Sequence, residues 1–90
     1  MPSKAVVFRV DGTKVELDHR PSLKEAQKIV GGYIELVSVG NGVTLVVDEE
    51  GLMKQKPLNK AATDLYNQRS PGGLIVGDVI ALTGWRTVGN

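Results

Sequence analysis

The sequence has no cysteine, a single histidine and few aromatic side chains among its 90 residues. The absence of cysteine excludes disulfide bonds, thiolate nucleophiles and cysteine-ligated zinc, so the domain must fold without covalent cross-links. This composition fits a reducing compartment, and we expect a cytoplasmic protein. The lone histidine, His19, has no second histidine with which to share a metal ion. We predict that it is an exposed loop residue and not a general base.

The sequence also lacks an excess of charge and a long apolar run. Eleven basic against ten acidic residues give a formal net charge of +1, far from the basic excess that proteins use to neutralise nucleic-acid phosphates. Binding to nucleic acid is therefore not expected. No apolar run approaches the roughly 20 residues that span a bilayer, and residues 1–10 become charged too quickly for a signal peptide. We expect one domain over residues 1–90, with no membrane segment.

Three regions of the sequence, each made of two segments, carry the signals of paired β-strands. Residues 5–10 and 13–17 flank Asp11-Gly12, which is typical of a tight hairpin turn. A second hairpin is predicted from residues 33–39 and 43–48 around Gly40-Asn41-Gly42, and its many β-branched residues favour a place at the centre of the sheet. Residues 74–76 and 79–83 predict a short piece and a closing strand around Gly77-Asp78.

Two short helices separate these hairpins. Ser22 and Glu25 form the pattern of a capping box, and Gly31-Gly32 supplies a stop. Asn59 is placed to cap a second helix. The apolar stripes at helical spacing are Leu23, Ala26, Ile29 and Val30 in the first helix, and Ala61, Ala62, Leu65 and Tyr66 in the second.

These elements predict an α+β fold with an antiparallel-dominated sheet and two short helices in the order ββαββαβ(β). We expect both helices to cover one face of the sheet. An uncovered apolar face would then need a partner, and we expect a homodimer. The candidates for that face are Val37, Val39, Val46 and Val47.

Four motifs occur in series: IVGGYIE at 29–35, VVDEEG at 46–51, PLNKAAT at 57–63 and IVGDV at 75–79. Together they resemble a small family of bacteriophage, bacterial and large-virus proteins known as a domain of unknown function. The resemblance runs over residues 23–82. It implies an accessory protein of a virus or mobile element, which would act in the cytoplasm of the host cell. It brings no agreed activity and no catalytic residue.

Two charged segments are candidate sites. Asp48, Glu49 and Glu50 could hold a cation, but neighbouring side chains on an extended chain point to opposite faces, so we predict no metal site. A solvated turn, with Glu49 or Glu50 paired to Lys54 or Lys56, is the favoured interpretation.

Lys54, Lys56 and Lys60 surround the helix start at Asn59, where free N–H groups favour an anion such as a small phosphorylated ligand. The alternative is a simple cap with surface lysines, because no glycine-rich phosphate loop is present.

Tyr33, after Gly31-Gly32, could stack on a ligand or partner, although a helix stop followed by a strand explains it equally.

No catalytic constellation or cofactor motif is present, so we do not expect an enzyme. The leading hypothesis is non-catalytic binding of a host protein through an exposed sheet edge or face and the loop at 49–59. The alternative is a nucleotide-type small-molecule binder that holds its ligand across a dimer interface. The candidate ligand or partner residues are Tyr33, Glu49, Glu50, Lys54, Lys56, Asn59 and Lys60.

Overall fold

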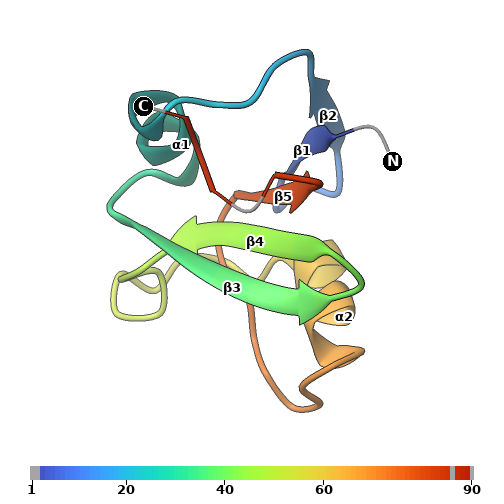
Figure 1. Ribbon diagram of the computed structural model, residues 1–90. Helices are drawn as coiled ribbons and strands as arrows, with labels where there is room; N and C mark the ends of the chain where they lie inside the picture. Colours follow the sequence, from blue (N-terminus) through green and yellow to red (C-terminus); the bar gives the residue numbers. More distant parts are fainter. Residues whose placement is uncertain (1–2, 86, 90) are drawn as a thin grey trace.

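A computed structural model describes residues 3–85 and 87–89 and shows an α+β fold in the predicted order ββαββαβ (Figure 1). Residues 74–76 do not form a further strand, since Val76 makes only an isolated bridge with Leu58. The elements are β1 (Lys4–Phe8), β2 (Lys14–Leu17), α1 (Leu23–Val30), β3 (Ile34–Gly40), β4 (Val43–Asp48), α2 (Lys60–Asn67) and β5 (Val79–Thr83).

The five strands form one antiparallel sheet in the order β2-β1-β5-β4-β3. The last strand, β5, is therefore inserted between β1 and β4 and joins the two hairpins. The prediction that the β3–β4 hairpin lies at the centre of the sheet is wrong for β3, which is an edge strand. The reason is that the central position depends on the non-local pairing of β5 with both hairpins.

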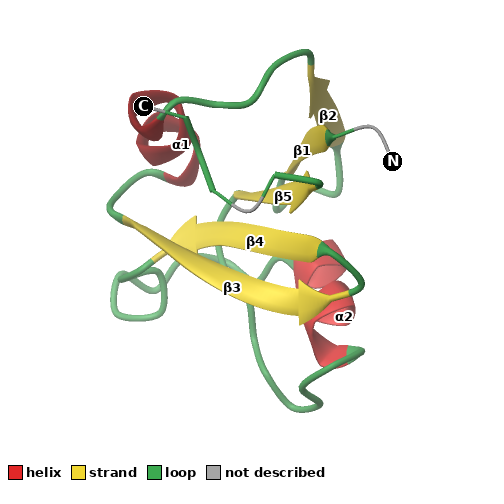
Figure 2. Cartoon of the chain, viewed as in Figure 1, coloured by secondary structure: helices red, strands yellow, loops and turns green. Residues whose placement is uncertain are grey.

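The helices lie on opposite faces of the sheet, so the prediction that both cover one face is also wrong (Figure 2). Side chains alternate between faces along β4 and β5. Val46, Ile80 and Leu82 pack with α1. The α2 side contains Val39, Leu45, Val47, Ala62, Ile75, Val79 and Ala81.

The valines proposed for an uncovered face are mostly in the core. Val39, Val46 and Val47 are buried, and Val37 is partly buried against the cluster on the α2 side. β4 lies between β5 and β3, and both faces of the sheet are covered at this strand. Its β-branched side chains are therefore buried on both faces. These residues therefore do not form an exposed interface.

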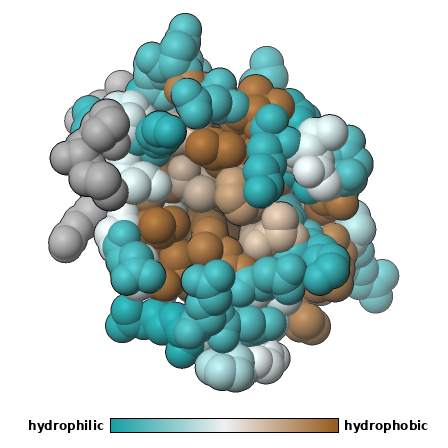
Figure 3. Space-filling view, turned by 90° about the vertical axis from the view of Figure 1, so that its right-hand side faces the viewer, coloured by the Kyte–Doolittle hydropathy of each residue, from teal (hydrophilic) through white to brown (hydrophobic). Residues whose placement is uncertain are grey.

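Two eight-residue helices, each about 12 Å long, are too short to cover the whole sheet. Phe8, Val37 and Val43 remain only partly buried on the α2 side. Figure 3 shows a face on which hydrophobic side chains gather in a hollowed patch framed by hydrophilic ones. Within the described residues, neither helix has the length and apolar character to cross a membrane.

Candidate functional site

The outer edge of β3 is one of two open edges of the sheet. β3 pairs with β4 on one side and with no other strand of the described chain. An edge strand presents every second backbone N–H and C=O outward, and these groups form a template for another strand. β3 is seven residues long, whereas β2, at the opposite edge, has only four. β3 therefore offers the longer template.

A hollow of about 250 Å³ lies beside β3 on the α2 face, and we call it the β3 groove. Leu52 and Leu74, which are 65% and 59% exposed, line it although both are large and apolar. Its position next to an edge strand places apolar surface where the side chains of an added strand would point. The groove residues are Glu35, Val37, Val47, Asp48, Glu49, Leu52, Tyr66, Gly73, Leu74, Ile75 and Val76.

Three carboxylates line the β3 groove, and they differ in their partners. The side chain of Asp48 is only 1% exposed and forms ion pairs with Lys54 and Lys56, at 2.9 Å and 2.6 Å. Glu35 and Glu49 are exposed and form no ion pair with any residue of the ranges 3–85 and 87–89. The groove therefore has a negative rim.

The Asp48 carboxylate is ionised despite its burial. Burial opposes ionisation, but hydrogen bonds from Lys56, Lys54 and the Glu50 N–H outweigh it and lower the pKa of Asp48 to about 2. We call Asp48, Lys54 and Lys56 the Asp48 cluster. Gly32 leaves room for the Asp48 carboxylate, since a Cβ at Gly32 would lie 3.0 Å from both of its oxygens. The cluster joins the end of β4 to the loop that follows it.

The same two ammonium groups bind the end of α1. Lys54 donates to the carbonyl of Gly31 at 3.2 Å, and Lys56 donates to the carbonyl of Val30. Cations are favourable there because the last carbonyls of a helix carry partial negative charge. The predicted pairing of Lys54 or Lys56 with Glu49 or Glu50 is therefore replaced by pairing with Asp48, whose buried carboxylate shares both ammonium groups with the end of α1.

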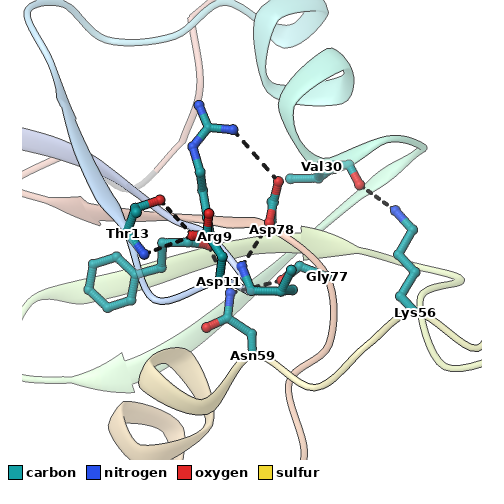
Figure 4. Close-up of polar contacts among 10 residues, drawn as sticks. Arg9, Asp11, Thr13, Val30, Lys56, Asn59, Gly77 and Asp78 are labelled. Atoms are coloured by element: carbon teal, nitrogen blue, oxygen red, sulfur yellow. Dashed lines mark hydrogen bonds and ion pairs between the residues drawn. The ribbon is translucent and has the colours of Figure 1, made fainter.

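Asn59 is completely buried and acts as a structural connection (Figure 4). Its side-chain oxygen accepts from the Ala62 N–H at 3.1 Å, which confirms the predicted cap. Its amide group donates to the carbonyls of Phe8 and Gly77, each at 2.8 Å. Lys60, the next residue, forms an exposed ion pair with Asp64 at 3.1 Å.

Five of the seven predicted site residues lie near one end of the sheet, where α1 ends and β3 begins. Tyr33 is 70% exposed there, and its carbonyl accepts from the N–H of Glu49 at 2.9 Å. Glu50, Lys54 and Lys56 belong to the same turn region. Asn59 and Lys60 lie apart from them, at the start of α2.

Sequence reasoning missed Glu35, Leu52 and Leu74 as components of the groove. A usable signal was present in Leu52 and Leu74, which are large apolar residues in irregular segments. It also missed the role of Asp78, which accepts from the Val10 N–H at 2.9 Å and lies 4.0 Å from Arg9 (Figure 4). Asp78 thus ties the first hairpin to the start of β5.

His19 is half exposed, as expected, but its ring contacts two carboxylates. Nδ1 lies 2.6 Å from Asp18, and Nε2 lies 2.7 Å from Glu25. Hydrogen bonds to Asp18 and Glu25 raise the pKa of His19 above its ordinary value. Because Glu25 also closes the capping box of α1, His19 supports the start of that helix.

Comparison with known proteins identifies the family. Residues 3–88 match the model of a domain of unknown function, DUF3846, and the chain belongs to that family. Comparisons with curated proteins and with solved structures gave no match. The α+β fold and the β3 groove are therefore the basis on which function can be proposed.

Proposed function

We propose that the chain is a non-catalytic binding protein that captures an extended segment of another protein by adding it as a strand to β3. The observation that carries this proposal is the open seven-residue edge of β3 lying directly beside the β3 groove, in which the apolar side chains of Leu52 and Leu74 are exposed. In β-strand addition, main-chain hydrogen bonds supply affinity, and pockets for alternate side chains supply specificity. The open edge of β3 supports the first part of this mode, and the groove beside it supports the second.

The exposed apolar residues near the groove support the same proposal. Leu52, Leu74 and Leu36 are each exposed by more than two fifths, and all three are on or beside β3 or its groove. Apolar side chains concentrated around an open strand edge are typical of a protein-binding surface. The turn carrying Glu49 and Glu50 forms one end of this surface, as the sequence-based hypothesis of an edge with the adjoining loop requires.

The motif resemblance to bacteriophage and large-virus proteins supports a viral or mobile-element context. In that context the partner is a protein of the host cytoplasm, and the chain acts by occupying its surface. The proposal requires no cofactor and no chemical step.

The test uses the full chain as bait for a random peptide display library, followed by hydrogen–deuterium exchange of the chain with each enriched peptide. We expect slower amide exchange at residues 34–40 and unchanged exchange at residues 14–17, because only the β3 edge is paired by the peptide. Absence of enriched peptides, or protection confined to other segments, would overturn the proposal.

A further inference from the structure

We infer that the segment captured by β3 carries a basic residue opposite Glu35 and apolar residues opposite Leu36 and Val37. We call this the basic–apolar–apolar pattern, read along β3; an antiparallel segment has the same residues in reverse order. The inference rests on the proposed function, because it specifies which strand the β3 edge accepts.

The groove side of the pattern follows from the register of β3. Glu35 pairs with Val47 and Val37 pairs with Leu45, so both side chains lie on the α2 face and line or border the groove. Directly opposite side chains of paired strands lie about 5 Å apart, close enough to interact. An added strand therefore places one residue against Glu35 and, two residues along, another against Val37 and the groove.

The opposite face gives the middle position. Leu36 lies between Glu35 and Val37 and points to the α1 face, where it pairs with Val46. It is 44% exposed, although Val46 beside it is fully buried. An apolar residue of the partner placed opposite Leu36 would remove this exposed surface from water.

The basic position follows from charge. Glu35 and Glu49 both line the groove and have no cationic partner among the described residues, while Lys54 and Lys56 are held by Asp48 and the end of α1. A cation from the partner is thus complementary to an unbalanced negative rim. Arginine suits it best, because its planar guanidinium has five donors.

A second copy of this chain does not fit the pattern. β3 itself, IELVSVG, contains no basic residue. The other open edge, β2, reads KVEL. With Lys14 opposite Glu35, a parallel copy would place Glu16 opposite Val37 at the groove, and an antiparallel copy would place Thr13 and Gly12, which lie in the turn before β2, opposite Leu36 and Val37. Lys14 is also already positioned over the ring of Phe8, 5.0 Å from its centroid. The partner is therefore a different protein.

The test titrates the full ¹⁵N-labelled chain with synthetic, end-capped peptides. The probes are Thr-Thr-Arg-Val-Val-Thr-Thr and its reversed sequence, each compared with a version in which Glu replaces Arg. We expect shifts of the β3 amide signals, with the Arg peptide of at least one direction binding about tenfold more tightly than its Glu counterpart, because opposite charges replace like charges at Glu35. Glu35→Lys should reverse that preference.

Glu16→Lys is the matched control, since Glu16 is an exposed glutamate on the same face of the other edge strand. It should leave the preference for the Arg peptide unchanged. If Glu35→Lys does not fold, Glu49→Lys tests the same rim and should weaken the preference.

The possible failures are distinct. Equal binding of the Arg and Glu peptides, with β3 amide shifts present, would overturn the basic–apolar–apolar pattern and leave strand addition standing. Absence of β3 amide shifts with every probe would overturn the pattern, while the library selection separately decides the proposed function. A preference that Glu16→Lys abolishes would also overturn the assignment to Glu35.

Discussion

The ammonium group of Lys56 lies 2.6 Å from the buried carboxylate of Asp48 and also donates to the carbonyl of Val30. One side chain thus connects the end of β4 to the end of α1. Because β3 starts four residues after Val30 and pairs with β4, this connection holds the beginning of the open edge in place. The lysines therefore have a structural role next to the proposed binding surface.

Removing the charge of Asp48 should destabilise the fold. In Asp48→Asn, the ammonium groups of Lys54 and Lys56 lose the buried carboxylate that balances their charge. We expect the free energy of unfolding to fall by about 2 to 3 kcal/mol, measured by urea denaturation. Asp64→Asn, which breaks an exposed pair with Lys60, should cost no more than about 0.5 kcal/mol. Equal losses in the two variants would contradict this role for Asp48.

The low pKa of Asp48 also predicts how stability depends on pH. Its folded pKa of about 2 lies below its ordinary value of 3.8, so the unfolded chain binds the proton more readily. The stabilisation from this carboxylate is present above about pH 4 and is lost as the pH falls toward 2, amounting to about 2 kcal/mol. Urea midpoints of the natural chain and of Asp48→Asn should converge over this interval. Parallel curves would show that another carboxylate is responsible.

His19 should titrate above its ordinary pKa of 6.5. Hydrogen bonds to Asp18 and then to Glu25 favour the imidazolium form. Its contribution to stability is complete below pH 6.5 and disappears as the pH rises through the folded pKa. An NMR titration of the ring protons measures this pKa, and Asp18→Asn should lower it while leaving the capping box intact. A His19 pKa of 6.5 or less in the natural chain would disprove the two-carboxylate contact.

Local sequence was sufficient to predict the capping box of Ser22 and Glu25, the helix end at Gly31 and the cap at Asn59. These features depend on residues within a few positions of one another. The edge position of β3 could not be predicted, because it depends on β5 pairing with both β1 and β4 across long stretches of chain. The groove was missed because its lining brings β3 and β4 together with Leu52 and residues 73–76, which are far apart in the sequence.

The partners of the charged residues also depend on contacts between distant parts of the chain, which the sequence did not predict. Sequence proximity predicts that Lys54 and Lys56 lie beside Asn59. In the folded chain their ammonium groups bind Asp48 and the last turn of α1, more than twenty residues earlier. Burial of Asp48 inverts the expected roles: Asp48 is the paired carboxylate, whereas Glu49 beside it has no cationic partner in the described chain.

Asn59→Asp should separate the two roles of Asn59. The variant retains an oxygen that accepts from the Ala62 N–H, but it replaces the amide that donates to the Phe8 and Gly77 carbonyls. A carboxylate facing two carbonyl oxygens in a buried site should lower the free energy of unfolding by about 2 to 4 kcal/mol. Urea denaturation measures the loss, and Lys60→Ala is the adjacent exposed control. Near-identical stability of Asn59→Asp and the natural chain would contradict a stabilising role for the hydrogen bonds from Asn59 to Phe8 and Gly77.

The nucleotide-type alternative predicts thermal stabilisation by nucleoside phosphates, and we expect none. A phosphate attracted to Lys54 or Lys56 would meet the Asp48 carboxylate and the negative end of α1, which already hold both ammonium groups. The measurement is the melting temperature with a panel of nucleoside mono-, di- and triphosphates. A ligand at 100 times its dissociation constant would add about 2.7 kcal/mol and be readily detected. A rise in melting temperature that Lys60→Gln abolishes would favour the nucleotide site at the start of α2 over capture at β3.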